Sequence, residues 1–441
     1  MSTDDQLRFL VSPGGELRGA PRVPGDKSIS HRAIMLGSIA EGITEIRGFL
    51  EGEDNLATLN AFRAMGVSIE GPDKNRVRVV GVGRDGLQCP AMPLDLGNSG
   101  TSMRLLAGLL AGQRFPTTLV GDASLMHRPM RRVTEPLAQM GARIQTSSHS
   151  TAPLRIEPAL ALKGIEYAMP VASAQVKSSL LLAGIYAQGE TCVIEPAPTR
   201  VHTERMLATF GYPVRRDGAK VCLGGGGRLT GTLVEVPADI SSAAFFMVGA
   251  SIAPGADLLL PQVGMDPTRI GVIHILKAMG ADLQISNERL LGAEPVADVR
   301  VRGARLKGIR IPETMVPLAI DEFPALFVAA ACAEGDTLLT GAAELRVKES
   351  DRIHAMAEGL AVLGIHAEPR PDGILIRGGR LGGGQVDSHG DHRVAMAFAM
   401  AALRAEDEIE ITRCSNVNTS FPGFVDLAAA AGLMIGMEWG P

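Results

Sequence analysis

Groups that bind small anions gather in the stretch PGDKSISHRAIMLGS, residues 24–38. Lys27 and Ser28 fall in the first turn of a predicted helix, and Arg32 lies four residues after Ser28 on the same helical face. A helix start adds exposed N–H groups and a positive dipole end, so the pattern favours a phosphate or carboxylate site. The alternative is a capped surface helix with ordinary salt bridges.

A second stretch of this kind is LGNSGTSMRLLAG, residues 96–108, in which a glycine-rich turn leads into a predicted helix. Such a turn offers successive backbone N–H groups to an anion. Gly100 and Thr101 are the candidate contacts, and Arg104 one turn later strengthens this interpretation. The glycine spacing matches neither a nucleoside-triphosphate loop nor a dinucleotide loop.

Three arginines cluster in GDASLMHRPMRRVTEPL, residues 121–137. The tight run before the Arg-Pro pair predicts a fixed loop that presents Arg128 to a ligand. Arg131 and Arg132 are expected to form surface salt bridges instead, because clustered charges are usually solvated and paired at the surface.

A candidate proton-transfer group lies in ELRVKESDRIHAMAEGL, residues 344–360. Lys348 and Arg352 are four residues apart and are predicted to share one helical face, with Glu349 beside Lys348. A carboxylic acid held between cations and a bound anion can act as a proton donor or base. The alternative is a surface helix joined by salt bridges between residues four apart.

Three more predicted helix starts carry polar residues. Helix capping accounts for Ser, Thr, Asn and Asp at such positions, but it does not account for Lys27, Gln175 or Arg393. His392 is equally compatible with a structural role, and no His or Glu spacing typical of a metal site occurs, so we expect no metal. The residues at these three starts are Ser173, Ala174, Gln175, Asp321, Glu322, Asp391, His392 and Arg393.

The segments that must position these groups form a sixfold repeat. Each copy pairs an apolar, buried helix with an amphipathic helix that ends in glycine, and strand-like residues follow both. Glycine fits the left-handed position that follows many helices. The predicted buried helices span 27–42, 98–112, 173–189, 240–255, 321–335 and 391–405, and the glycines are Gly66, Gly141, Gly211, Gly280, Gly364 and Gly432. The repeat predicts an α/β protein, with a non-catalytic scaffold that binds anionic metabolites as the alternative to an enzyme.

The placement of the polar residues suggests how the copies work together. If three copies pack around one axis, their helix starts converge, and two such domains would face each other across a cleft rich in anion-binding ends. The substrate should then be a small molecule with several negative charges.

The composition narrows the partners and the compartment. The 441-residue chain has a formal net charge of −5, which gives no general attraction to nucleic acid or to an anionic membrane. The N-terminus lacks the basic and apolar regions of a secretory signal, and no apolar run is long enough to span a bilayer, so we expect a cytoplasmic protein. The five scattered cysteines predict reduced thiols rather than a disulfide framework or a zinc site.

Along essentially its whole length the chain resembles the EPSP synthase family of enolpyruvyl transferases. The resemblance rests on nine ordered motifs: PGDKSISHRA, LGNSGTSMR, GDASLMHRPM, SAQVKSSLLLAG, PTRVHTERML, IDEFPALFVAAA, ELRVKESDRI, DHRVAMAFA and TSFPGF. It implies a two-domain inside-out α/β barrel, each domain built from three β-α-β-α-β-β units with pseudo-threefold symmetry. One domain would comprise residues 1–21 and 244–441 and the inserted domain residues 22–243, with the active site in the cleft between them.

The resemblance also implies an activity, in which the enolpyruvyl group of phosphoenolpyruvate moves to the 5-hydroxyl of shikimate-3-phosphate through a tetrahedral intermediate, on the shikimate pathway to chorismate and the aromatic amino acids. It suggests Asp321, Glu349 and Lys27 for proton transfer. Shikimate-3-phosphate would be bound by Lys27, Ser28, Arg32, Ser173, Ala174, Gln175, Arg200, Asp321 and Lys348. Phosphoenolpyruvate would be bound by Lys27, Gly100, Thr101, Arg128, Gln175, Arg352 and Arg393. A monomer that needs no cofactor is implied.

Three positions depart from the pattern of many family members. Thr419 stands where many have Lys, Arg200 where many have Tyr, and Glu344 where many have Asn. The departures resemble a branch that includes glyphosate-insensitive members, and that branch often has Ala in place of Gly100. Glycine leaves room for the herbicide, so we expect a sensitive enzyme.

Two enzyme families with the same repeat are the nearest alternatives. UDP-N-acetylglucosamine enolpyruvyl transferases commonly carry a reactive Cys in the loop before an Arg-Pro pair, whereas the loop here, GDASLMHRP, has none. Their Lys-Asn start is also replaced by Lys27 and Ser28. RNA 3′-phosphate cyclases are disfavoured because the near-neutral chain has no basic stripe.

Overall fold

The computed structural model describes residues 6–440, and the chain divides into two compact units. Among the described residues, unit 1 contains residues 6–24 and 237–440, and unit 2 is Gly25–Val236. Residues 22–24 and 237–243, which the sequence assigned to the inserted domain, therefore pack with unit 1. Each unit has its own hydrophobic core.

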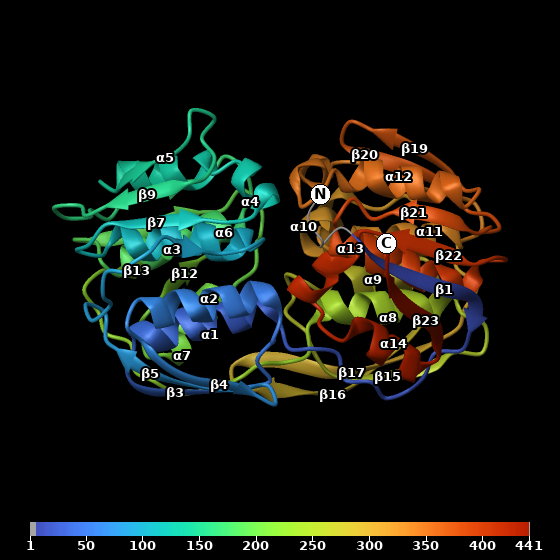
Figure 1. The fold of residues 1–441 in the computed structure, drawn as a ribbon, viewed down its shortest axis with the longest axis horizontal. Coiled ribbons are helices and arrows are strands. Elements are labelled where there is room, and N and C mark those ends of the chain that lie inside the picture. The colour runs from blue at the N-terminus through green and yellow to red at the C-terminus, as the bar shows by residue number, and fades with distance from the viewer. Residues whose placement is uncertain (1–5, 441) are drawn as a thin grey trace. The chain divides into compact units, whose positions relative to one another are not determined.

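Unit 2 contains three four-stranded sheets that share one topology (Figure 1). In each sheet the first pair of strands is parallel and the other two pairs are antiparallel. In hydrogen-bonding order they are β14 (Leu233–Glu235), β3 (Glu41–Arg47), β5 (Arg76–Val82) and β4 (Ser68–Asp73); β6 (Leu94–Asp95), β7 (Thr117–Val120), β9 (Leu154–Glu157) and β8 (Arg143–Gln145); and β10 (Glu166–Ala168), β11 (Glu190–Ile194), β13 (Lys220–Gly224) and β12 (Arg215–Asp217).

Unit 1 repeats this topology, with one sheet reduced to three strands. In the reduced sheet, isolated parallel bridges from Lys307 to Glu334 and from Arg310 to Leu338 take the place of the first strand. The sheets are β2 (Arg18–Gly19), β15 (Asp257–Gly264), β17 (Glu294–Arg302) and β16 (Asp282–Leu291); β18 (Asp336–Leu339), β20 (Gly373–Arg377) and β19 (His366–Arg370); and β21 (Gly384–Asp387), β22 (Ile409–Thr412), β1 (Leu7–Gly15) and β23 (Leu433–Trp439).

The helices confirm the predicted pairing of a buried and an amphipathic helix in each of six copies. The buried helices are α1 (Lys27–Ile39), α3 (Gly100–Ala111), α6 (Ala174–Gly184), α8 (Ile240–Ile252), α11 (Phe323–Ala331) and α13 (His392–Ala401). Their partners are α2 (Glu53–Ala64), α5 (Arg131–Gln139), α7 (His202–Thr209), α9 (Gly271–Ala278), α12 (Arg352–Val362) and α14 (Phe424–Ala431). All six predicted glycines have positive φ, as the left-handed helix end requires. A short helix, α4 (Ala123–His127), precedes α5, and another, α10 (Val316–Ala319), precedes α11.

Small side chains allow the three buried helices of unit 1 to pack on one another. Helices α8, α11 and α13 contact each other pairwise and lie side by side in Figure 1. Every residue of α8 is buried, and its sequence ISSAAFFMVGASI combines two phenylalanines with small residues that allow close packing. The helix starts within the unit are therefore held by a rigid apolar core.

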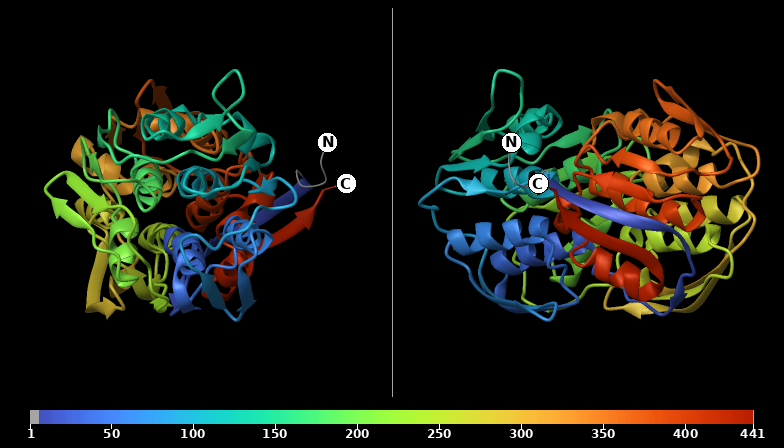
Figure 2. Two further views of the ribbon diagram at one scale, coloured as in Figure 1. Left: turned by 90° about the vertical axis from the view of Figure 1, so that its left-hand side faces the viewer. Right: turned by 45° about the vertical axis from the view of Figure 1, so that its right-hand side comes forward.

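The first strand of the chain completes a sheet built otherwise from its last residues. Strand β1 lies between β22 and β23, antiparallel to both, as the blue strand beside the red strands in Figure 2. Phe9 pairs in register with Ile411 on one side and Met437 on the other. Local periodicity predicts the strands but not this long-range pairing.

The cysteine prediction is wrong for two of the five residues. Cys192 on β11 and Cys222 on β13 are directly opposite each other in the sheet and form a disulfide. Their 30-residue separation hides this proximity in the sequence. Cys89, Cys332 and Cys414 are free thiols. Between residues 6 and 440, no helix is long and apolar enough to cross a bilayer.

Candidate functional site

The start of α1 has the predicted arrangement. Lys27 and Ser28 form the first turn, and the carboxylate of the N-cap residue Asp26 accepts a hydrogen bond from the Ile29 amide. Lys27 Nζ lies 2.9 Å from Asp54 Oδ2 on the neighbouring helix α2. Asp54 was not predicted from the sequence, because it lies 27 residues away on another helix. This ion pair fixes the direction of the ammonium group.

Arg32 is buried and held by three oxygen atoms. Its Nη1 donates to the Ser28 carbonyl at 2.9 Å, its Nε to Thr203 Oγ1 at 2.7 Å and its Nη2 to Ser178 Oγ at 2.8 Å. Thr203 also donates to Ser178 at 2.7 Å. All three acceptors are neutral oxygen atoms, and together they fix the orientation of the guanidinium group.

The glycine-rich start of α3 meets two guanidinium groups. A Cβ atom placed on Gly100 would lie 3.1 Å from Nη1 of Arg104 and 3.1 Å from Nη1 of Arg128. Arg104 donates to Gln175 Oε1 at 2.6 Å, and Gln175 Nε2 donates to Thr101 Oγ1 at 3.1 Å. The starts of α3 and α6 are thus linked through predicted residues, with Arg104 between them.

Arg128 follows a short helix, α4, where the sequence predicted a fixed loop. Asp122 caps α4 by accepting from the Leu125 amide, and Arg128 comes directly after α4. Its Nη2 donates to Asn98 Oδ1 at 2.6 Å and to Ser124 Oγ at 3.3 Å. These neutral acceptors orient a guanidinium group that is 8% exposed.

The remaining predicted residues of unit 2 lie at two further helix starts. Ser173 caps α6 by accepting from the Val176 amide, so Ala174 and Gln175 form the first turn. Arg200 lies two residues before α7 and is half-buried. The cationic side chains at or near these helix starts are Lys27, Arg32, Arg104 and Arg128, and Lys27 pairs with Asp54.

Arg352 is the centre of the residues predicted in unit 1. This side chain is 1% exposed, and its Nη2 lies 2.6 Å from Glu349 Oε2. Its Nη1 lies 3.5 Å from Asp321 Oδ1, and its Nε donates to Asp391 Oδ2 at 2.8 Å. Burial alone lowers the pKa of Arg352, but Asp391, Glu349 and Asp321 outweigh it and raise the pKa above its usual value.

Asp391 was predicted only as part of a helix start, and it forms a buried ion pair with Arg352. It is fully buried, caps α13 by accepting from the Arg393 amide, and also accepts from Ser350 Oγ at 3.1 Å. Burial alone would raise the pKa of Asp391, yet Arg352 opposes this and the net shift is downward. The residue therefore stays ionised and holds Arg352 in place.

The predicted helical face shared by Lys348 and Arg352 is wrong. A 3-10 helix spans Ala343–Val347, Lys348 ends it, and α12 begins only at Arg352 with Asp351 as its cap. Asp351 stops a continuous helix because its side chain accepts from the His354 amide. Lys348 Nζ nevertheless lies 3.3 Å from Asp321 Oδ1, so the two residues meet in space.

Arg393 completes the group in unit 1. It lies in the first turn of α13, and its Nη1 donates to the Asp321 carbonyl at 3.0 Å and lies 3.9 Å from Glu322 Oε1. Asp321 thus contacts Lys348 and Arg352 through its carboxylate and Arg393 through its backbone.

Thr419 is one of the positions that depart from the family pattern. It is 4% exposed and its hydroxyl donates to the Asn416 carbonyl, so it does not supply the positive charge of the lysine that many family members have at this position.

His31 makes the stability of unit 2 depend on pH. It lies buried between α1, α2 and α3, with Nδ1 2.8 Å from Thr58 Oγ1. Burial, together with Lys27 and Arg32, lowers the pKa of His31 well below the usual 6.5. The unfolded chain therefore takes up the proton first as the pH falls, and stability is lost below about pH 6.5 by up to ~1.4 kcal/mol per pH unit.

Urea unfolding between pH 7.5 and roughly 5 measures this slope. We expect His31→Gln to flatten it, whereas the exposed His149→Gln should leave it unchanged. An unaltered slope in His31→Gln would contradict the assignment.

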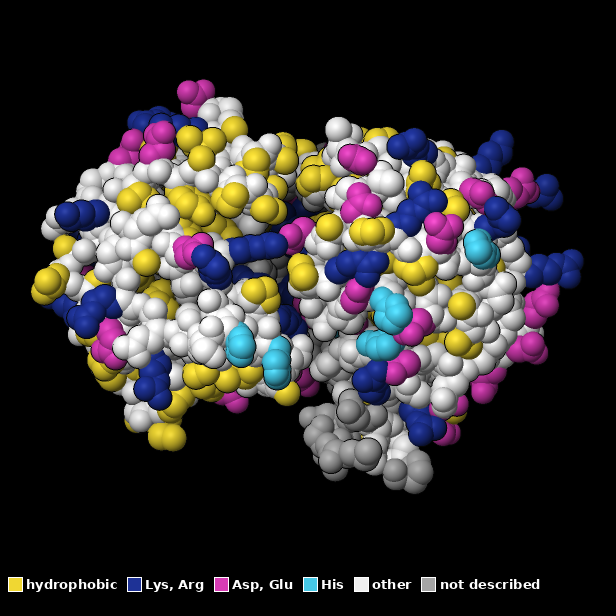
Figure 3. All heavy atoms as spheres, turned by 90° about the horizontal axis from the view of Figure 1, so that it is seen from above, with side chains coloured by type: hydrophobic (Ala, Val, Ile, Leu, Met, Phe, Trp, Pro, Cys, Tyr) yellow, Lys and Arg dark blue, Asp and Glu magenta, His cyan; other side chains and the backbone are white. Residues whose placement is uncertain are grey.

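The fold and these contacts define an α/β protein of six repeated units. Arginine and lysine side chains gather at its helix starts, where neutral acceptors or buried carboxylates orient them. Such helix starts bind small anions. On the face seen in Figure 3, by contrast, basic side chains lie among acidic ones and form no continuous basic stripe.

Comparisons with known proteins name the family. The model of EPSP synthase (3-phosphoshikimate 1-carboxyvinyltransferase) matches residues 11–427. The 3-phosphoshikimate 1-carboxyvinyltransferase of Methylococcus capsulatus is 68% identical over 98% of this chain and 99% of its own length. That of Alkalilimnicola ehrlichii is 69% identical over 97% and 96%. A solved EPSP synthase from Acinetobacter baumannii is 58% identical, covers 98% of this chain and all of its own, and superposes with a TM-score of 0.88.

The chain therefore belongs to the EPSP synthase family. The family assignment and the predicted α/β fold of repeated units are confirmed.

Proposed function

We propose that this protein transfers the enolpyruvyl group of phosphoenolpyruvate to the 5-hydroxyl of shikimate-3-phosphate, releasing phosphate. Membership of the EPSP synthase family carries the proposal. The gathered cations at the helix starts support it, because both substrates are anions and must be held close together despite their mutual repulsion. The protein would work as a cytoplasmic monomer without a cofactor.

Phosphoenolpyruvate is assigned to the arginines around Gly100 and in unit 1. Arg128, Arg352 and Arg393 supply planar guanidinium groups that suit carboxylate and phosphate oxygens. Thr101 and Gln175 are joined to each other by a hydrogen bond and can orient the same substrate. Lys27 is assigned to both substrates, where its ammonium group would compensate negative charge.

Shikimate-3-phosphate is assigned to residues of both units. Its phosphate suits the helix starts at Ser28 and Ser173 with Arg200, while Asp321 and Lys348 are assigned to its ring hydroxyls. Because Asp321 belongs to unit 1 and Ser173 to unit 2, the proposal requires both units to contact this substrate during turnover.

Proton transfer is assigned to two carboxylates that share one guanidinium. Asp321 takes the proton of the attacking 5-hydroxyl, and Glu349 gives a proton to C3 of phosphoenolpyruvate as the new C–O bond forms at C2. In the elimination, Glu349 recovers a proton from the C3 methyl group, and Asp321 returns its proton to the departing phosphate. Protons balance, and both groups regain their starting state. Arg352 keeps them in position, since it contacts both at 2.6 and 3.5 Å.

Phosphate release from phosphoenolpyruvate tests the proposal. We expect release with shikimate-3-phosphate as acceptor and none with UDP-N-acetylglucosamine. Phosphate release only with UDP-N-acetylglucosamine would show that the acceptor is the nucleotide sugar. No release with either acceptor, in a folded protein, would favour a binding scaffold. A product mass equal to the acceptor plus an enolpyruvyl group would exclude simple phosphatase activity.

A further inference from the structure

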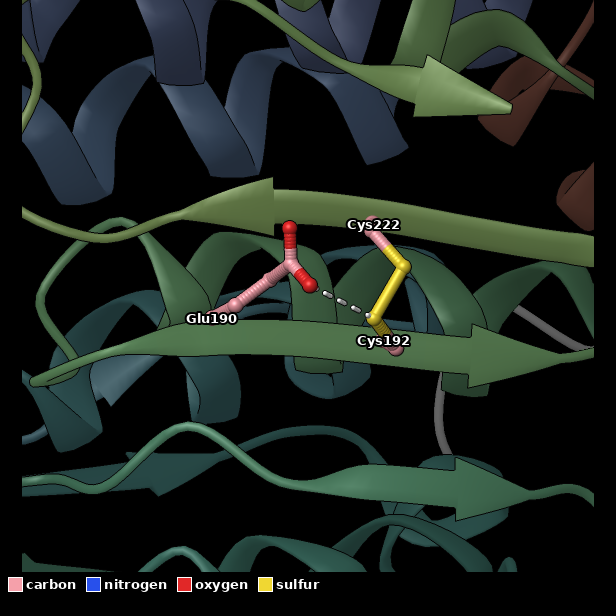
Figure 4. Close-up of side chains that lie close together, drawn as sticks. All are labelled: Glu190, Cys192 and Cys222. Carbon is pink, nitrogen blue, oxygen red and sulfur yellow. Dashed lines mark hydrogen bonds between the residues drawn. A yellow bond between two sulfur atoms is a disulfide. The ribbon is translucent and has the colours of Figure 1, made fainter. Parts of the chain in front are cut away.

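Two cysteines and a glutamate meet on the third sheet of unit 2 (Figure 4). Val193 and Val221 of strands β11 and β13 point into the hydrophobic core, so the alternate residues Cys192 and Cys222 point to the other face of the sheet. Glu190, two residues before Cys192, shares their face. Its Oε2 lies 3.5 Å from Cys192 Sγ.

Two ion pairs flank the sulfur atoms on this face. Arg215 Nη2 lies 2.9 Å from Glu190 Oε1, and Lys220 Nζ lies 2.5 Å from Glu166 Oε2. The cysteines are only 4% and 3% exposed, although they lie outside the main apolar cluster of unit 2. The first ion pair occupies Oε1 of Glu190 and leaves Oε2 directed at the sulfur.

A small cavity reaches this cluster. It has a volume of about 110 Å³ and is lined by Arg215, Asp217, Lys220 and Cys222. Small solutes can therefore approach the sulfur of Cys222 without unfolding the sheet.

We propose that reduction of the Cys192–Cys222 disulfide creates a site for a thiophilic divalent cation such as Zn²⁺, with Cys192, Cys222 and Glu190 as its ligands. The candidate ligand atoms of these three residues all lie within 4.8 Å of one another, so one ion can reach all of them after small side-chain rotations. Two sulfurs and a carboxylate oxygen are ligands that zinc accepts, and water can take the fourth position.

The charges of the cluster fit this proposal. Two thiolates add two negative charges to a face on which Glu190 and Glu166 are already balanced by Arg215 and Lys220. A divalent cation restores neutrality, whereas the disulfide is neutral by itself. The bound cation thus offsets the two thiolate charges, which the disulfide does not carry.

The two states are linked by a balanced redox step. A dithiol reductant transfers two electrons and two protons to the S–S bond, which becomes two thiols, while the reductant becomes a disulfide. Metal binding then displaces both thiol protons. The disulfide state cannot bind the ion in this way, because neither sulfur is available as a thiolate.

Cadmium titration of the full-length protein tests the proposal, because cadmium–thiolate bonds absorb in the ultraviolet. Thiol counting first verifies the state, with five thiols after reduction and three in the disulfide form. The reduced protein should bind one Cd²⁺ per chain with a charge-transfer band that Zn²⁺ abolishes, and the disulfide form should show no band. Glu190→Gln should weaken binding by about tenfold or more, since even residues behind a ligand have effects of that size.

Matched variants separate this site from the other thiols. Cys222→Ser should remove the band, and Cys89→Ser, which removes the exposed free thiol, should retain it. Burial raises the pKa of Cys332 and Cys414 to about 12, so these thiols compete poorly for metal. The proposal is overturned if the reduced protein shows no band, if Cys222→Ser keeps it, or if Cys89→Ser loses it. None of these residues is assigned to the substrates, so phosphate release serves as the folding control.

Discussion

Replacing Glu349 with glutamine is expected to lower kcat for phosphate release by about 10²–10⁴-fold, with little change in either KM. Glutamine has nearly the same shape and can still accept the hydrogen bond from Arg352 Nη2, which lies 2.6 Å from Glu349 Oε2. It cannot give a proton to C3 of phosphoenolpyruvate or recover one in the elimination. The substitution therefore removes the chemistry assigned to this residue and preserves its main contact.

Glu358→Gln is the matched control for this prediction. Glu358 is also a glutamate of this segment, but it lies on the exposed side of α12, where it contacts His354 and His389. Its replacement should leave kcat nearly unchanged. If Glu349→Gln also retained kcat within a few-fold, the proton transfer to C3 would have to be assigned to another group, such as Lys27.

Replacing Arg128 with alanine is expected to lower kcat/KM for phosphoenolpyruvate by about 10²–10³-fold, or ~3–4 kcal/mol. The guanidinium is 8% exposed, is oriented by Asn98 at 2.6 Å and approaches the helix start at Gly100. Its loss removes charge-assisted hydrogen bonds from a partly desolvated site. The KM for shikimate-3-phosphate should change much less, because that substrate is assigned to other residues.

Arg131→Ala provides the control from the same segment. Arg131 is 71% exposed and pairs with Glu135 one turn later, an interaction that contributes only ~0.5 kcal/mol or less. Its kinetic constants should therefore stay close to those of the unchanged protein. Equal losses in Arg128→Ala and Arg131→Ala would indicate a general electrostatic effect and would remove Arg128 from the phosphoenolpyruvate site. Arg128→Lys should recover only part of the loss, because an ammonium lacks the planar pair of donors.

The two units hold their arginines by different means. In unit 2, Arg32 and Arg128 donate to hydroxyl, carbonyl and amide oxygens. In unit 1, Arg352 is surrounded by carboxylates. This difference matches the proposed roles, because the proton-transfer groups Asp321 and Glu349 both contact Arg352.

The sequence alone determined the repeated helices and strands, because local periodicity and helix-ending glycines depend only on nearby residues. It also determined the chemistry of the helix starts: Lys27, Gln175 and Arg393 lie in the first turns where they were predicted. Motif resemblance extended this to the family. These features depend on neighbouring residues, so they do not change with the contacts made by distant parts of the chain.

Only the tertiary structure decided which distant residues meet. Asp54 pairs with Lys27, and Asp391 with Arg352, across separate helices that no spacing relates. Strand β1 joins β22 and β23, and Cys192 faces Cys222, because strand pairing is set by core packing and register rather than by nearby sequence. The sequence pattern predicts one helix that carries both Lys348 and Arg352. In the structure Asp351 caps a new helix that begins only at Arg352, so the two residues do not share a helix.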